Sequence, residues 1–401
     1  MSPVSTADVA IVGGGVIGAA CARAAAGRGL HIAVFEPGPD PAAASPASAG
    51  MLAAQIEPTD ELLLGLGVRS RDYYEALAAA LKDTTGIDIG FWRGGIASVA
   101  LKETEVDQLR EHVALQRQAG LRCDWLEPGD VHERWPGAAP ECVGALFAPE
   151  DGAVDPQALI RALLADARRL GAALVPTAVD ELQTAGGRVT GVRAGGSVIT
   201  TERVVVAAGA WSSRLPGLGR ELPIEPVRGQ MAMTPWPADT PPAILYHIGH
   251  GYVLMRGSDA ILGSTMEHAG FDAVVTNEGL AQIFRSAVRL LPALASLTVA
   301  RSWAGLRPVT PDGRPIIGPD PDVAGLYYAT GHGRNGVLLA ALTGEIIGDL
   351  LTKGETDVDL APLSPTRTFT PITDQDILKP DVLRLTSDVY DLRLLQRQAR
   401  R

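Results

Sequence analysis

A glycine-rich turn near the start of the chain has the spacing G-x-G-x-x-G, with glycines at Gly13, Gly15 and Gly18. It follows a short apolar, β-prone run and precedes an alanine-rich segment that can form a helix. In such a unit the first glycine permits a tight turn, the second lets the backbone approach a pyrophosphate, and the third allows close helix–strand packing. The N-terminus of the helix then holds the anion. This context predicts a dinucleotide-binding site that includes Val16 and Ile17.

An acidic residue closes the second strand of the same unit. Glu36 follows the β-prone run 31–35 and stands 18 residues after Gly18. A carboxylate at this distance accepts a hydrogen bond from a ribose hydroxyl. The structural alternative is a glycine turn in an ordinary α/β unit.

A single arginine stands in the apolar stretch Gly305-Leu306-Arg307-Pro308. A guanidinium can hold a carboxylate through two parallel hydrogen bonds. Because its sequence neighbours are apolar, we expect Arg307 to be partly buried and to need an anion. That anion is either a structural partner such as Asp312 or the carboxylate of a ligand.

A second glycine-rich turn, Gly333-Arg334-Asn335-Gly336, precedes an apolar helix that begins at Val337. The backbone N–H groups and the positive dipole end of such a helix point out of its N-terminus. They can stabilise negative charge that develops on a cofactor ring. The alternative is a simple helix cap, a position that suits Asn335.

The elements that position these residues follow from hydrophobic periodicity and cap signals. Helices are predicted over 62–86, 103–118, 156–170 with Asp155 as N-cap, 280–291 and 337–351. Strands are predicted over 31–35, 94–101, 171–175 and 203–211, with a hairpin over 189–192 and 197–200. The small, turn-rich residues 39–50 predict a loop.

Strand-to-glycine junctions recur at 12–15, 206–209 and 329–333. In an open α/β sheet, ligands bind at the carboxyl ends of strands. The three junctions therefore predict an α/β protein with a Rossmann-like cofactor domain assembled from separated segments and a β-rich α+β second domain. The proposed division is 1–86, 151–215 and 305–360 for the cofactor domain, 87–150 and 216–304 for the substrate-binding domain, and 361–401 for a C-terminal extension.

Composition narrows the function classes. The chain has 401 residues, of which 46% are apolar, enough for two domains with a sizeable core. A net charge of −11 argues against a nucleic-acid partner. Three cysteines, Cys21, Cys123 and Cys142, argue against a disulfide framework and favour a reducing cytoplasm. Neither a signal peptide nor a long apolar run is evident, so we expect no membrane span.

Nine pieces of the sequence carry a family resemblance: VAIVGGGVIGAACA (9–22), VFEPG (34–38), SAGMLAAQ (48–55), VVVAAGAWS (204–212), PVRGQM (226–231), GYVLMR (251–256), GSTMEH (263–268), WAGLRPVTPDGRPIIG (303–318) and GHGRNGVLLAALTGE (331–345). Together they resemble the D-amino-acid oxidase family of flavoenzymes, and most of all its glycine oxidases. The pairing of GLRP-x-T-x-DG with GH-x-RNG is the most specific part. The resemblance covers residues 8 to about 355 and implies FAD, a two-domain fold and oxidation of an amino acid to an imino acid.

The resemblance also assigns residues to the cofactor. The implied FAD contacts are the fingerprint residues with Glu36, the loop Ser48, Ala49, Gly50 and Met51, the backbone of Val179, the strand end Ala208, Gly209 and Trp211, and the turn Gly333, Arg334, Asn335, Gly336 and Val337. Only one dinucleotide fingerprint is evident, which favours FAD over NAD. Some relatives attach flavin through a C-terminal cysteine. All three cysteines here precede residue 143, so we expect non-covalent FAD.

For the substrate, the resemblance implies that Arg307 holds a carboxylate, with Arg334 assisting it or contacting the flavin. The hydroxyl of Tyr252 adds a hydrogen bond. The implied pocket also includes His250, Met51 and Met266, of which the two methionines limit the room for a side chain. His247 and His250 stand three residues apart without a supporting ligand pattern, so we expect no metal site.

The implied activity is oxidative deamination of glycine or small D-amino acids. Hydride passes from Cα to flavin N5 and O2 accepts the electrons, giving an imino or 2-oxo acid, ammonia and peroxide. A D-amino-acid dehydrogenase that reduces a quinone and a sarcosine- or proline-type secondary-amine oxidase share these motifs and stay open. An FAD-containing structural or electron-transfer subunit is the non-enzyme alternative, against which Arg307 and Tyr252 argue. Thiamine biosynthesis is an expectation at the level of the family.

The tail beyond Pro362 matches none of these pieces. It holds many apolar residues, namely Ile377, Leu378, Val382, Leu383, Leu385, Val389, Leu392, Leu394 and Leu395. A solvated tail would hold fewer. We therefore expect the tail to dock, and we expect a homo-oligomer.

Overall fold

The computed structural model describes residues 5–38, 40–58, 60–248 and 251–372. One of its two large sheets has six strands: β1 Val9–Val12, β2 Ile32–Phe35, β8 Ala173–Val175, β12 Val204–Val206, β18 Ile316–Pro319 and β19 Leu326–Thr330. Their spatial order is β18-β19-β12-β1-β2-β8, and all neighbours are parallel except the edge strand β18. This mostly parallel sheet confirms the Rossmann-like α/β class.

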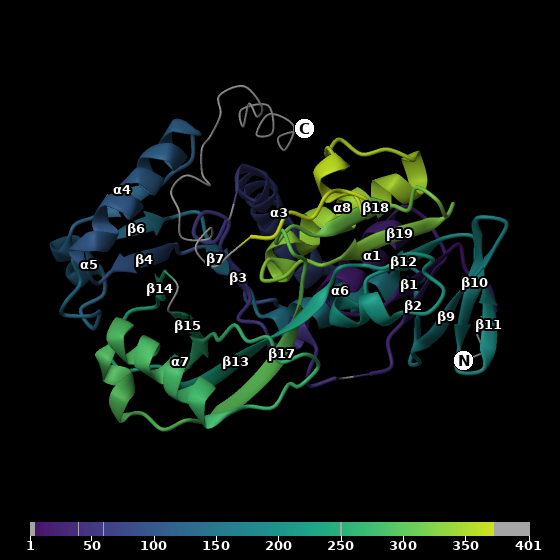
Figure 1. Ribbon diagram of the computed structural model, residues 1–401. Coiled ribbons are helices and arrows are strands. Elements are labelled where there is room, and N and C mark those ends of the chain that lie inside the picture. Colours follow the sequence, from purple (N-terminus) through teal and green to yellow (C-terminus); the bar gives the residue numbers. More distant parts are fainter. Residues whose placement is uncertain (1–4, 39, 59, 249–250, 373–401) are drawn as a thin grey trace.

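Four helices accompany this sheet: α1 Val16–Gly27, α3 Glu61–Thr85, α6 Pro156–Arg169 and α8 Gly336–Lys353 (Figure 1). Helix α1 packs on α6 and α8, and α3 packs on the same two helices. Small residues permit the close contact of α1 with α8, because a Cβ at Gly344 would lie 2.8 Å from the Ala20 carbonyl oxygen. The two helices are buried on most of their sides, as helices without a polar face must be.

The second sheet has eight strands: β4 Ile96–Ala100, β5 Asp124–Leu126, β6 Gly144–Ala148, β13 Glu225–Pro235, β14 Ile244–His247, β15 Gly251–Arg256, β16 Asp259–Gly263 and β17 Arg301–Val309. Their order is β17-β13-β16-β15-β14-β4-β6-β5, with α4 Glu103–Gln118, α5 Pro128–Arg134 and α7 Asn277–Leu290 packed on them. In Figure 1, β17 leads from this sheet toward the first. The domain boundary proposed at residue 305 falls inside β17, and the division stays a proposal.

Smaller units complete the described part. β9 Val179–Ala185, β10 Arg188–Ala194 and β11 Ser197–Thr200 form an antiparallel sheet that contains the predicted hairpin. β3 Met51–Leu52 pairs with β7 Gly152–Ala153. Short helical segments are α2 Ala44–Ala47, η1 Gly209–Arg214, η2 Pro292–Ser296 and η3 Ala361–Leu363. None of the helices in the described ranges has the length and apolar character needed to cross a bilayer.

Capping residues place the helix ends where the sequence predicts them. Asp60 accepts a hydrogen bond from the N–H of Leu63 and begins α3, and Gly86 ends it in the left-handed region at φ 72°. Asp155 caps α6 ahead of Pro156 as predicted. Capping depends on only a few neighbouring residues, so it can be predicted from the sequence.

Two predictions of local structure were wrong. The strand predicted over 203–211 ends at Val206, because Gly209 at φ 55° turns the chain into η1. The loop predicted over 39–50 contains the helical turn α2. In the C-terminal extension, Leu363 is fully buried and Arg367 pairs with Asp312 at 2.7 Å. The apolar residues from Ile377 onward lie outside the described residues.

Candidate cofactor and substrate site

A cavity of about 460 Å³ lies at the carboxyl ends of β1, β2, β12 and β19 and extends to β13, β15 and β17 of the second sheet. All three strand-to-glycine junctions reach it, so the structure brings together segments that are far apart in sequence. Its walls are mainly backbone and apolar side chains. Charged groups occur near both ends, with Glu36 in the fingerprint region and Glu57, Arg307 and Arg334 in the region of the second sheet.

The fingerprint glycines are required by close backbone contacts. Gly13 has φ 104°, and a Cβ there would lie 2.5 Å from the Ala207 carbonyl oxygen. A Cβ at Gly18 would lie 1.9 Å from the carbonyl oxygen of Gly13. Gly18 thus serves packing and does not line the cavity, whereas Gly13, Gly15 and the start of α1 do. The N-terminus of α1 opens toward the cavity and is suited to an anion.

Glu36 lies beside this turn and lines the cavity. Its Oε2 accepts a hydrogen bond of 2.6 Å from the N–H of Gly14, which fixes the carboxylate next to the glycine loop. A Cβ at Gly14 would lie 2.9 Å from that of Glu36. Val179, Ala208, Gly209 and Trp211 also line the cavity, as the resemblance implies.

The loop from Ser48 to Met51 forms the wall between the two ends. Gly50 has φ 75°, and a Cβ there would lie 2.1 Å from the carbonyl oxygen of Val154. Arg256 of β15 donates to the carbonyl of Ala49, and Trp303 of β17 donates to that of Ala47 at 2.8 Å. Strands of the second sheet therefore hold the loop against the cavity.

The N-terminal turn of α8 contributes Gly333, Arg334, Gly336 and Val337 to the wall. Asn335 is not among the lining residues, and its side chain makes no capping hydrogen bond. Asn335 thus stands at the N-cap position of α8 without a side-chain capping bond, while the first backbone N–H groups of α8 lie at the cavity. His332 stands just before them and bonds to the Thr343 hydroxyl at 3.1 Å. Burial lowers the pKa of His332 to about 3, so its imidazole is neutral there.

Arg307 projects from β17 into the same region. Its Nη1 donates to the carbonyl oxygen of Thr265 at 3.1 Å and its Nη2 to the Ser264 hydroxyl at 2.8 Å. The ion pair with Asp312 is not formed, because Asp312 pairs with Arg367. Burial lowers the pKa of Arg307, but a guanidinium stays charged in proteins. The site therefore holds a cation whose described hydrogen-bond partners are neutral oxygens.

Gly229 of β13 makes room for this guanidinium. A Cβ at that position would lie 2.0 Å from Nη1 of Arg307, so any larger residue would displace the side chain. Tyr252 lies nearby on β15 and donates to Met231 Sδ at 3.4 Å. Burial raises the pKa of Tyr252 to about 12, so its hydroxyl keeps its proton. Met51 lines the same region.

One implied pocket residue is not found there. Met266 is 46% exposed and does not line the cavity. Just after β16, Thr265 is buried, whereas the next residue, Met266, is exposed. His250 lies outside the described residues.

The residues missed from the sequence include Ser264, Met231 and Glu57, which all line the cavity. Glu57 stands two residues beyond the piece that ends at Gln55, and its Oε1 lies 3.8 Å from Nη1 of Arg334. The negative charge of Glu57 is the main cause that raises the pKa of Arg334. The sequence offered one signal for Glu57, namely its place just after the matched piece 48–55.

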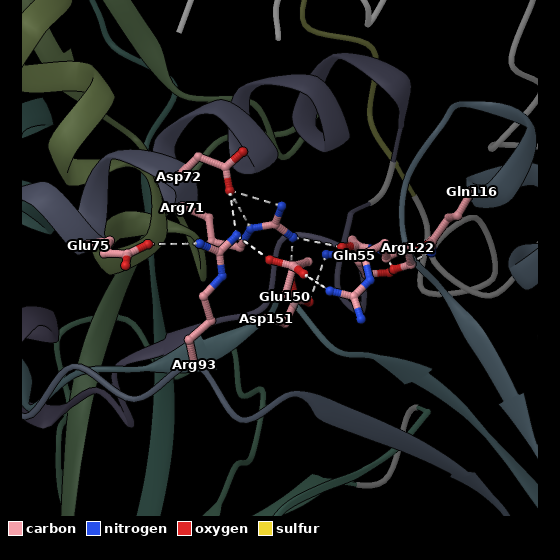
Figure 2. A network of polar contacts seen from close by, with 9 residues as sticks. All are labelled: Gln55, Arg71, Asp72, Glu75, Arg93, Gln116, Arg122, Glu150 and Asp151. Carbon is pink, nitrogen blue, oxygen red and sulfur yellow. Dashed lines mark hydrogen bonds and ion pairs between the residues drawn. The ribbon is translucent and has the colours of Figure 1, made fainter. Parts of the chain in front are cut away.

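A buried polar network fixes the backbone that leads to Glu57 (Figure 2). Asp151 pairs with Arg71 at 3.0 Å and accepts the N–H of Gln55 at 2.9 Å. Arg71 donates to the Gln55 side chain at 2.7 Å, and Gln116 donates to the Gln55 carbonyl at 2.8 Å. These four side chains are less than 5% exposed. Burial raises the pKa of Asp151 to about 6, so the carboxyl is ionised at neutral pH.

Comparisons with known proteins agree with this geometry. The model of the DAO family, described as FAD dependent oxidoreductase, matches residues 8–350. Glycine oxidase of Geobacillus kaustophilus is 38% identical over 90% of this chain and 97% of its own length. Its crystal structure superposes with a TM-score of 0.87 over 91% of this chain and 100% of that chain, at 37% identity. The bifunctional protein ThiO/ThiG of Trichormus variabilis is 37% identical over 88% of this chain and 54% of its own length.

Proposed function

Because the chain belongs to the DAO family of FAD-dependent oxidoreductases, we propose that it oxidises glycine or a small D-amino acid with O2 as the electron acceptor. Membership makes it an FAD-dependent amino-acid oxidase, and the choice of substrate and acceptor is the proposal. The observation that carries it is Arg307, a cation at the cavity with neutral hydrogen-bond partners. A carboxylate is the ligand that such a guanidinium binds best.

The residues present fit FAD. The close turn at Gly13, the N-terminus of α1 and the carboxylate of Glu36 suit a pyrophosphate and a ribose. The N-terminus of α8 suits the ring end, where its N–H groups can stabilise negative charge. When bound, FAD would accept the hydride, which carries two electrons, and would pass those two electrons to O2.

The protein's own part in the reaction is to bind and orient. Arg307 holds the substrate carboxylate, and its bonds to Ser264 and Thr265 fix the guanidinium before substrate arrives. The protonated hydroxyl of Tyr252 can donate to the same carboxylate in place of its weak hydrogen bond to Met231 Sδ. The substrate amine needs only to be neutral for Cα to release a hydride, so no nucleophile–base pair is required.

FAD is expected to be held without a covalent bond. All three cysteines are buried thiols, and none of them lines the cavity. The purified protein should be yellow, and acid precipitation should leave FAD in the supernatant, where chromatography identifies it. Flavin retained in the pellet would contradict non-covalent binding, and FMN or NADP in the supernatant would contradict the fingerprint assignment.

Small substrates are expected to react fastest, because Met51 and Tyr252 restrict the region beside Arg307. The test is a panel of glycine, sarcosine, D-alanine, D-proline and D-phenylalanine under air, with peroxide detection. Glycine, sarcosine or D-alanine should exceed D-phenylalanine in kcat/KM. Faster turnover of D-phenylalanine would refute the pocket assignment. Reduction of a quinone or dye without peroxide would favour the dehydrogenase, and a preference for sarcosine or D-proline would favour a secondary-amine oxidase.

We also propose a homo-oligomer in a cytoplasmic location. The buried Leu363 and the ion pair of Arg367 support a docked extension. Light scattering should give a mass above that of one chain. Deletion of 365–401 should lower the number of chains per particle or the midpoint of thermal unfolding. A monomer that is unaffected by the deletion would refute both the docked tail and the oligomer. A role in thiamine biosynthesis stays a family-level proposal, supported by the identity to ThiO/ThiG.

A further inference from the structure

Two arginines lie at the same end of the cavity, and they differ in their partners. Arg307 donates to the neutral oxygens of Thr265 and Ser264. Arg334 stands 3.8 Å from the carboxylate of Glu57. All three charged side chains line the cavity, and the side chain of Glu57 is only 10% exposed.

The three charged side chains interact electrostatically with one another. Arg334 lowers the pKa of Arg307 by repulsion, and Glu57 raises it by attraction. Two cations and one anion leave one net positive charge, which matches a substrate with a single carboxylate. A second carboxylate would have to bind Arg334 in competition with Glu57, beside a like charge. Like charges brought together in a desolvated site are strongly disfavoured.

The backbone that carries Glu57 is held in place by hydrogen bonds. The backbone N–H of Gln55 is bound to Asp151, and the Gln55 carbonyl is bound to the Gln116 side chain. The N–H of Glu57 itself donates to the carbonyl of Ala53 at 3.3 Å. The segment is thus held at both the backbone and the side chain of Gln55, next to the cavity.

We propose that Glu57 is a specificity-determining residue, which occupies Arg334 and so restricts the site to substrates with one carboxylate. Without its charge, Arg334 becomes a second carboxylate anchor and the site accepts amino acids that carry a carboxylate on each side of the nitrogen. This inference rests on the proposed function in one respect, because Arg307 must hold the first carboxylate.

The test compares two ethers that cannot be oxidised as amines. Methoxyacetate has one carboxylate, and oxydiacetate has the same skeleton with a second. Binding to the FAD-loaded enzyme is followed through the change in flavin absorbance. The wild type should bind methoxyacetate more tightly. Glu57→Gln should shift the ratio of the two dissociation constants toward oxydiacetate by at least about tenfold, since removal of one like charge is worth at least about 1.4 kcal/mol.

Three further variants separate charge from shape. Glu57→Asp keeps the charge and should retain most of the wild-type ratio. Glu57→Gln combined with Arg334→Gln should lose the gain for oxydiacetate, because the second anchor is gone. Glu75→Gln is the matched control: this exposed acid of α3 pairs with Arg93 and is not among the cavity residues, so the ratio should not change.

The outcomes are distinct for the two proposals. If methoxyacetate binds and Glu57→Gln leaves the ratio as in the wild type, the inference is overturned while the carboxylate site stands. A gain for oxydiacetate that persists without Arg334 also overturns it. If neither ether perturbs the flavin in either protein, the carboxylate site of the proposed function is refuted and the inference falls with it.

Discussion

Arg307→Ala is expected to lower kcat/KM by about 1.4 to 3.6 decades while the FAD content stays near that of the wild type. Loss of one partner of a buried charge pair costs about 2–5 kcal/mol. At about 1.4 kcal/mol per decade, this gives the stated range. FAD should remain because the side chain faces Ser264 and Thr265 rather than the fingerprint. Steady-state kinetics and the ratio of flavin to protein absorbance measure the two quantities.

Three controls make this result specific. Arg307→Lys should recover only part of the loss, because an ammonium cannot form two parallel hydrogen bonds. Arg301→Ala changes an exposed arginine of the same strand and should leave kcat/KM almost unchanged. Discrimination between glycine and methylamine, which lacks the carboxylate, should largely disappear in Arg307→Ala. A variant that loses its flavin, or that keeps full discrimination, would assign Arg307 a structural role.

Asp151→Ala is expected to lower the free energy of unfolding by about 3–5 kcal/mol, the usual effect of removing one partner of a buried ion pair. Burial raises the pKa of Asp151, which shows that its desolvation is only partly offset by Arg71. Removal of the carboxylate is still costly, because the N–H of Gln55 loses its acceptor and Arg71 loses its fully buried acidic partner and keeps only the more exposed Asp72. Denaturant unfolding at pH 8, where Asp151 is ionised, measures the loss.

The same network supplies the control for Asp151→Ala. Arg122 pairs with Glu150 at 2.7 Å, but its side chain is 73% exposed (Figure 2). Arg122→Ala should therefore cost no more than about 1 kcal/mol. Equal losses for the two variants would mean that burial does not set the strength of the Arg71–Asp151 pair.

The parts of the fold that the sequence predicted well are governed by short-range chemistry. The fingerprint, the cap at Asp155 and the glycine that ends α3 each depend on a few neighbouring residues. The expectation that three strand ends meet at one cavity also held, because parallel strands place their carboxyl ends along one edge.

The remainder depends on contacts between distant segments. Ser264 becomes a partner of Arg307 only because the chain after β16 continues along β13, and the side chain of Arg307 reaches it across Gly229. No local sequence pattern indicates this contact. The error at Met266 has a similar origin, because a resemblance to a family does not show which side chains of a segment face the cavity. Glu57 lacked an assignment because its role requires Arg334, almost three hundred residues away in sequence.

Strand β17 has a consequence for how this enzyme can vary. It pairs with β13 along its whole length, and the same strand carries Arg307 and touches the cofactor side through bridges of Leu306 to Ala43 and of Val309 to His332. One continuous piece of backbone thus sets the spacing between the carboxylate anchor and the turn that starts α8. A hybrid made by exchanging the second sheet between relatives must therefore inherit residues 301–309 as an undivided block together with β13. Substrate choice can therefore change most easily through the side chains around this strand. A change in the length or register of β17 would alter the spacing that the strand sets.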